Sequence, residues 1–285
     1  GEDALRAGPG LPAPRPPPRR QGPGGPPIAP RFLLGPTASG KSEAGLLLAE
    51  ALGAEILSLD AMAVYRGMDI ATAKPDAAAR ARVRHHGLDL VAPSEEFNLR
   101  RFLETARSLL AEPDARILGI VGTPYYLHRL QEGLFEGPGA DWKLRASLEA
   151  KGAEALHAEL SGLDPAAAAA IAPRDLRRLV RALEVCLATG KPFSRWQKEA
   201  TSGGIAPGLL LGIRRSREDL LARIDRRVDA MFAAGLVAET ERLKTLGLSR
   251  SASQALGTKE VLEYLEGRLG LPEAVALVKL RTRQF

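Results

Sequence analysis

The sequence of 285 residues contains a single cysteine, Cys186, and this scarcity excludes an internal disulfide framework. It also lacks a cleavable signal pattern and an uninterrupted apolar stretch of membrane-spanning length. We therefore expect a protein of the reducing cytoplasm with no membrane partner. Histidine is scarce too, and the His85-His86 pair has no cysteine or further histidine near it at ligand spacing. That context favours a structural or hydrogen-bonding role over a metal site.

Hydrophobic residues make up 45% of the chain, which is enough for a proper core. Lysine and arginine outnumber aspartate and glutamate by 40 to 34, and the resulting net charge of +6 suggests a polyanionic partner without deciding it. Residues 1–30 are rich in proline and glycine, so we expect a disordered tail. Because the chain begins with Gly1 and stops within an apparently helical segment at Phe285, we expect a fragment of a longer protein.

Residues 35–42, Gly-Pro-Thr-Ala-Ser-Gly-Lys-Ser, fill every fixed position of the G-x-x-x-x-G-K-[ST] phosphate-loop template. An apolar run precedes the stretch and a helical pattern follows it, as the motif requires. The residues predicted to hold a diphosphate or triphosphate are Gly35, Thr37, Ala38, Ser39, Gly40, Lys41 and Ser42. Lys41 would supply a mobile charge and Ser42 a ligand for Mg²⁺. Because the motif does not separate ATP from other diphosphates, an ATP-dependent small-molecule phosphotransferase stays open.

Apolar runs at 32–34, 55–59, 116–121 and 209–213 predict buried parallel strands. Ligands of parallel α/β sheets bind outside the carboxyl ends of the strands, and these ends carry Lys41, Asp60, Thr123 and Arg217. We therefore predict an α/β fold, a phosphate-loop parallel sheet flanked by helices, with one ligand site at this edge. Arg217 opens a helix that Ser216 caps, where a cation opposes the helix dipole, so an anion contact is favoured over a surface role.

Residues 136–207 are helical and alanine-rich in pattern, which predicts an all-α insertion between core segments 31–135 and 208–285. Four arginines there fall at i, i+3, i+4 and i+7, opposite an apolar face of the same helix: Arg174, Arg177, Arg178 and Arg181. An ordinary solvated face and a surface that contacts phosphate backbones both stay open as interpretations. Cys186 in the same helix is expected to pack as a small apolar residue.

An ordered series of matches runs along the chain after residue 30. It comprises residues 35–42, Asp60 to Tyr65, Arg66 to Ile70, Thr72 to Pro75, His85-His86, Gly122-Thr123, Arg181 to Val185, Thr189-Gly190, Arg226 to Met231 and Thr282 to Gln284. In these motifs the chain resembles the tRNA dimethylallyltransferases.

The resemblance implies transfer of a dimethylallyl group from dimethylallyl diphosphate to N6 of the adenosine immediately 3′ of the anticodon in tRNA. The phosphate loop would then hold a diphosphate leaving group with Mg²⁺, Asp60 would act as general base, and Thr123 and Arg217 would position the reactants and the diphosphate. The implied partner is the anticodon stem-loop of tRNA, and we expect a monomer.

The residues that the resemblance places against tRNA are Asp60, Ala61, Met62, Ala63, Arg145, Arg177, Arg178, Arg181, Gln254, Lys259 and Arg283. Ala61 and Ala63 stand where the family usually has serine and often has glutamine. These two departures leave a catalytically impaired tRNA-binding homologue as a further alternative.

Overall fold

The computed structural model describes residues 31–112, 115–134, 137–199, 204–205 and 208–284, so the tail expected at 1–30 lies outside the described residues. The chain divides into two compact units. The first runs up to Tyr126 and resumes at Gly208, and the second runs from Leu127 to Pro207. The second unit thus begins earlier than the insertion expected at residue 136, because the division falls inside helix α4 (Pro124–Glu132).

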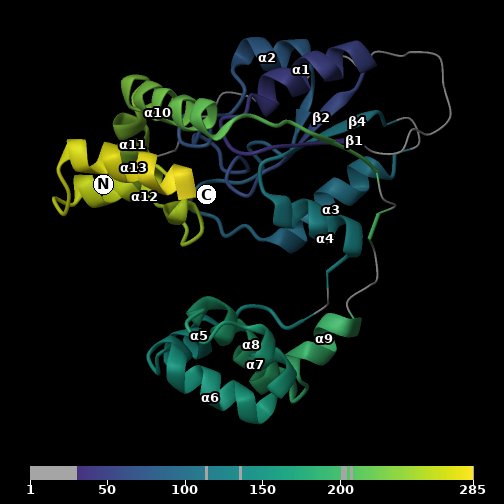
Figure 1. The fold of residues 1–285 in the computed structure, drawn as a ribbon, viewed down its shortest axis with the longest axis vertical. Helices are drawn as coiled ribbons and strands as arrows, with labels where there is room; N and C mark the ends of the chain where they lie inside the picture. The colour runs from purple at the N-terminus through teal and green to yellow at the C-terminus, as the bar shows by residue number, and fades with distance from the viewer. Residues whose placement is uncertain (1–30, 113–114, 135–136, 200–203, 206–207, 285) are drawn as a thin grey trace, which may run out of the picture. The chain divides into compact units, whose positions relative to one another are not determined.

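A parallel sheet with the strand order β3-β2-β4-β1-β5 forms the centre of the first unit, as far as the structure describes it (Figure 1). The strands are β1 (Arg31–Leu34), β2 (Glu55–Leu59), β3 (His85–His86), β4 (Ile117–Val121) and β5 (Leu209–Gly212). The four predicted strands are confirmed to within a residue at their ends. The prediction that all four are buried is wrong for β5, which lies at the edge of the sheet with Leu209 54% and Leu210 51% exposed. The edge strand β3 was not predicted as a strand, because two histidines make no apolar run.

Helices cover both faces of this sheet, with α1 and α2 on one face and α3 on the other (Figure 1). The helices of the first unit, apart from α4 at its boundary, are α1 (Lys41–Leu52), α2 (Ala77–Arg82), α3 (Leu99–Leu110), α10 (Arg217–Ala233), α11 (Leu236–Leu246), α12 (Thr258–Leu265) and α13 (Leu271–Gln284), with a 3₁₀ turn at Ala252–Gln254. Central strand residues such as Leu57 and Leu118 are fully buried, as expected for a parallel sheet enclosed by helices. The predicted α/β class is confirmed.

Helix α10 begins where the sequence predicts, because the Ser216 hydroxyl accepts the backbone N–H of Asp219 at 3.2 Å and caps the first turn. Its buried residues Ile224 and Val228 pack against Val278 of α13. The face of α10 that carries Ile224 and Val228 is therefore occupied by this packing, and the other faces of the helix are available for other contacts. None of the described helices is both long and apolar enough to cross a membrane.

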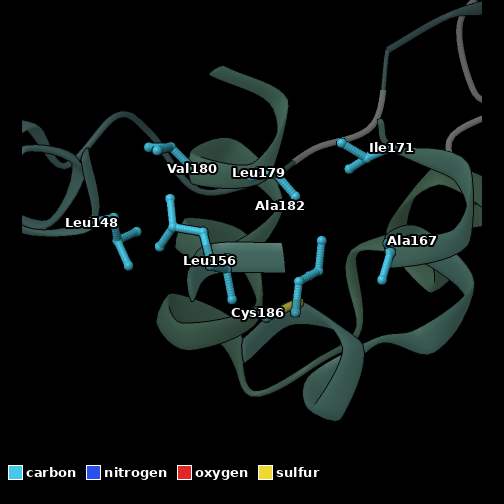
Figure 2. Packing of buried hydrophobic residues seen from close by; sticks show 11 residues of the cluster. Leu148, Leu156, Ala167, Ile171, Leu179, Val180, Ala182 and Cys186 are labelled. Atoms are coloured by element: carbon cyan, nitrogen blue, oxygen red, sulfur yellow. The ribbon is translucent and has the colours of Figure 1, made fainter. Parts of the chain in front are cut away.

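The described residues of the second unit form helices and the loops that join them, without a strand. After the end of α4 it contains α5 (Trp142–Glu149), α6 (Ala153–Leu163), α7 (Pro165–Ala170), α8 (Leu176–Thr189) and α9 (Phe193–Glu199). Its core gathers aliphatic side chains from α5 to α8 around Leu156, Leu179 and Cys186 (Figure 2). Cys186 is buried among them, which confirms its predicted packing role.

The basic stripe of α8 is shorter than its spacing predicts. Asp175 caps the helix by accepting the backbone N–H of Arg178, so Arg174 lies before the first turn. Leu176, the first residue of the helix, is 36% exposed. Arg177 and Arg178 remain on the exposed face of the helix.

Candidate functional site

The phosphate loop joins β1 to α1 and presents backbone donors at the helix N-terminus. Ala38 and Gly40 have positive φ angles, 59° and 93°, which turn the chain sharply before Lys41 begins the helix. Gly40 caps the helix without a side-chain hydrogen bond, so no side chain of the cap competes for the amides of the first turn. The buried Ser39 hydroxyl has no hydrogen-bond partner among the described residues. These groups together suit an anion.

Lys41 folds back onto its own loop. Its Nζ donates to the carbonyl oxygens of Gly35 and Pro36, both at 2.6 Å. Burial and the charge of Arg227 lower the pKa of Lys41 to about 8, while the Asp60 carboxylate opposes this shift. The ammonium is therefore held over the loop in an environment that lacks sufficient negative charge, which an anionic ligand would supply.

Two arginines that follow β5 in the sequence donate hydrogen bonds to backbone carbonyl groups of the same loop. Arg215 donates through Nε to the carbonyl of Ser39 at 2.6 Å, and Arg223 donates through Nε to the carbonyl of Ala38 at 2.9 Å. Because these guanidinium groups bind two carbonyl groups of a tight turn, the turn is held in shape, and within it the Ser39 N–H donates to the Pro36 carbonyl at 3.3 Å. The phosphate loop is thus fixed by residues more than a hundred positions away in sequence.

A cavity of about 570 Å³ opens beside the loop within the first unit. Residues 37–43 form one wall, residues 72–75 another, and the carboxyl ends of β2 and β4 contribute Asp60 and Gly122. Arg223, Arg226 and Arg227 of α10 complete it. With Lys41 and Lys74 also present, cations outnumber carboxylates in the lining, so the cavity favours a multiply charged anion.

Asp60 is held in one orientation by the backbone that follows it. Its Oδ1 accepts the N–H groups of Met62 at 2.8 Å and Ala63 at 3.2 Å. Its other oxygen lies so close to Gly122 that a Cβ there would approach Oδ2 to 2.4 Å. A glycine at the end of β4 is therefore what lets the carboxylate sit against this strand.

Thr123 and Arg217 lie differently from Asp60 and Lys41. The Thr123 hydroxyl accepts the backbone N–H of Ala61 at 3.1 Å and so ties the end of β4 to the segment after β2. Arg217 is exposed at the start of α10, and the cavity lining contains Arg223, Arg226 and Arg227 of that helix instead. The roles predicted for Thr123 and Arg217 stay predictions.

The three cavity arginines of α10 were not predicted as site residues from the ends of the strands, because they lie two and three turns into the helix. Their spacing of i, i+3 and i+4 was a usable signal, since it places them on one helix face. Burial lowers the pKa of Arg227, and the negative charge of Asp60 opposes that effect. The arginine and the aspartate therefore act on each other across the cavity.

The wall at residues 72–75 is fixed by two buried charges. The Glu239 carboxylate of α11 accepts the backbone N–H groups of Asp69, Ile70 and Ala71 at 2.8, 2.8 and 3.0 Å. Lys74, whose side chain is 1% exposed, donates to Asp89 at 2.6 Å. The polar segment 64–75 is thus an irregular but firmly anchored loop.

The residues predicted to contact tRNA fall into several environments. Ala63 is buried and lines the cavity, while Ala61 and Met62 are partly buried beside Asp60. Gln254 is exposed in the 3₁₀ turn and Lys259 is half-buried in α12. In the first unit, Arg283 pairs with Asp225 at 2.6 Å.

In the second unit the predicted arginines divide into two pairs. Arg177 and Arg178 are exposed on α8. Arg145 and Arg181 both pair with the buried carboxylate of Glu184, Arg145 in a bidentate arrangement at 2.8 Å for each bond. Their guanidinium groups are thus engaged within the unit.

This fold and site define an α/β phosphate-loop protein whose anion cavity also holds an oriented carboxylate. Residues 63–285 match the family described as IPP transferase. A tRNA dimethylallyltransferase of Geobacter sulfurreducens is 46% identical over 265 residues, which span 89% of this chain and 85% of that protein. The chain belongs to the IPP transferase family.

Solved structures agree with this assignment. The tRNA isopentenylpyrophosphate transferase of Bacillus halodurans is 37% identical, with a TM-score of 0.62 over 90% of this chain and 83% of that one. A eukaryotic dimethylallyltransferase acting on tRNA is 27% identical, with a TM-score of 0.74 over 90% of this chain and 67% of that one.

Proposed function

We propose that this protein transfers the dimethylallyl group of dimethylallyl diphosphate to N6 of the adenosine 3′-adjacent to the anticodon in tRNA. The observation that carries the proposal is that Asp60 lines the same cavity as the phosphate loop and the α10 arginines. A phosphate loop beside a carboxylate base would also serve a phosphotransferase, and similarity to the tRNA dimethylallyltransferases favours prenyl transfer.

The reaction breaks the allylic C–O bond, and its electron pair leaves with the diphosphate. Negative charge therefore grows on the leaving group as the dimethylallyl group becomes cationic. Lys41, Arg223 and Arg227 line the place where that charge develops. Because burial lowers the pKa values of Lys41 and Arg227, a bound diphosphate would stabilise the charged forms of both side chains.

The new bond forms between N6 of adenine and the allylic carbon, and the amine then has one proton too many. The Asp60 carboxylate accepts this proton as general base. Its orientation depends on backbone N–H groups of Met62 and Ala63. The alanines at 61 and 63 therefore leave the alignment of the base intact, which supports an active enzyme over an impaired homologue.

The site is compatible with Mg²⁺. Ser42 lies exposed in the first turn of α1 and lines the cavity, so its hydroxyl would be the protein ligand. Within the described residues no three His, Cys, Asp or Glu side chains gather at a place that would hold a metal by themselves. The remaining ligands would come from the diphosphate, and the bound ion would neutralise part of its charge.

The proposal is tested by incubating the protein with unmodified tRNA, dimethylallyl diphosphate and Mg²⁺, followed by mass spectrometry of the tRNA nucleosides. The expected product is adenosine carrying one dimethylallyl group at N6, in a reaction that consumes no ATP. A parallel incubation with ATP and small acceptors detects the alternative. Transfer of a γ-phosphate without incorporation of the isoprenoid would contradict the proposal.

A further inference from the structure

The second unit contains a buried charge cluster that its stability alone does not explain. Glu184 of α8 is buried, yet its carboxylate accepts bonds from Arg145 and Arg181 and from the backbone N–H of Asp141 at 2.8 Å. Arg181 also donates to the carbonyl of Pro138 at 3.0 Å. Buried ion pairs of this kind gain little stability over an apolar core, so a cluster of this size suggests a positioning task.

The cluster positions Trp142. This residue is the first of α5, directly after Asp141, and the Arg145 guanidinium lies over its ring at 5.0 Å from the centroid. The indole is nevertheless 46% exposed. Because Arg145 is itself held in a bidentate bond to Glu184, one ring face has a fixed cationic backing. The indole ring of Trp142 is therefore exposed, and its orientation is restricted.

We infer that Trp142 is a stacking platform for an unpaired base of the RNA substrate. Unpaired bases of RNA loops are bound by stacking on aromatic rings, and the exposed Trp142 ring, held by Arg145, offers such a surface. Lys143 beside it and Arg177 and Arg178 on α8 give the unit exposed positive charge for the phosphate backbone. Arg145 is then a positioning residue that contacts Trp142, and Glu184 and Arg181 act through Arg145. This inference rests on the proposed function, since it assumes an RNA substrate.

Binding of unmodified tRNA, measured without dimethylallyl diphosphate, tests the inference. Trp142→Ala should weaken binding by about 5- to 150-fold, the range found for loss of one stacked base. It should leave the slope of log K against log salt unchanged, because no phosphate contact is removed. Trp142→Phe keeps a ring over Arg145 and should keep most of the affinity. The matched control is Leu163→Ala, an apolar residue of the same unit that is also 46% exposed.

Fluorescence gives a second measurement that needs no loss of affinity. The chain has two tryptophans, so the Trp196→Phe variant emits from Trp142 alone. An anticodon stem-loop should quench that emission, and a fully paired RNA duplex with the same number of nucleotides should not. Quenching by both RNAs, or by neither while the stem-loop binds and becomes prenylated, would overturn the inference and leave the proposed function standing. If the wild-type protein binds no tRNA, the inference about Trp142 and the proposed function both fail.

Discussion

At the scale of single residues, Gly122 and Asp60 depend on each other. A Cβ at residue 122 would approach Asp60 Oδ2 to 2.4 Å, so Gly122→Ala must displace either the carboxylate or the end of β4. We expect a loss of stability of about 1–3 kcal/mol, as for other overpacked sites, together with a slower prenyl transfer. Chemical denaturation and a rate assay on the same preparation measure both effects.

Gly212→Ala is the control for this substitution, because a Cβ there meets no atom of the described part of the chain within 4 Å and the residue lies in the same sheet. It should retain the wild-type rate. A Gly122→Ala enzyme as fast as the Gly212→Ala enzyme would show that the position of the Asp60 carboxylate does not limit the reaction.

The titration of Lys41 predicts how diphosphate binding depends on pH. Its pKa is lowered to about 8, chiefly by burial, so the ammonium loses its proton as the pH rises through this value. A bound anion favours the charged form and raises this pKa. Affinity for inorganic diphosphate should therefore fall above pH 8, and binding there should take up a proton. Calorimetry in buffers of different ionisation enthalpy measures that uptake.

The Lys41→Met variant serves as the reference for this prediction. It should bind diphosphate weakly at all pH values and show a smaller proton uptake near pH 8. Equal uptake by the variant and the wild-type protein would mean that another group titrates.

At the scale of elements, the strands and the phosphate loop were predictable from the sequence because each is a local signal. Apolar runs mark β1, β2, β4 and β5, and a fixed template marks residues 35–42. Strand β3 was missed because a two-residue edge strand is defined by its partner β2 and not by its own pattern. Local sequence patterns thus predicted the strands and the phosphate loop that carry the site.

Contacts between distant elements were not predictable in the same way. Glu239 reaches backbone groups 168 to 170 positions earlier in the chain, and no sequence periodicity encodes such a pairing. The choice of Arg223, Arg226 and Arg227 over Arg217 as cavity residues likewise depends on how α10 lies against the loop. Tertiary packing decides both, and a single sequence does not reveal it.

The loop at residues 69–71 provides a test of this packing. Glu239→Gln replaces one acceptor oxygen by an amide donor that faces backbone N–H groups, so at least one bond is lost. We expect faster hydrogen exchange at Asp69, Ile70 and Ala71 and a loss of about 1–3 kcal/mol in unfolding free energy. The wall that carries Lys74 should loosen with it, which raises KM for dimethylallyl diphosphate more than it lowers kcat.

Glu241→Gln on the exposed side of the same helix is the matched control and should change none of these quantities. Exchange at residues 69–71 that stays at the wild-type rate in Glu239→Gln would remove the anchoring role from Glu239.

At the scale of the whole molecule, the excess of positive charge predicts a salt-dependent association with tRNA. Arg177 and Arg178 are exposed on α8, whereas Arg145 and Arg181 are engaged with Glu184. Removing Arg177 and Arg178 together should weaken tRNA binding and reduce the slope of log K against log salt by about one to two. Titrations at several salt concentrations measure the slope.

Arg100→Ala, an exposed arginine on α3 of the first unit, controls for the change in net charge. If it reduces the slope as much per residue as the α8 substitutions do, the effect reports overall charge and not a surface of the second unit.

The account as a whole holds that one cavity brings an isoprenoid diphosphate and a base together on an adenine of tRNA. Single-turnover prenylation by wild-type protein and by Asp60→Asn tests this most directly, with tRNA binding measured on both. The asparagine keeps the shape of the side chain and its acceptor for Met62, but it removes the base. We predict equal tRNA binding and a rate lowered by about a hundred- to ten-thousand-fold. An Asp60→Asn enzyme that prenylates tRNA at the wild-type rate would contradict the account.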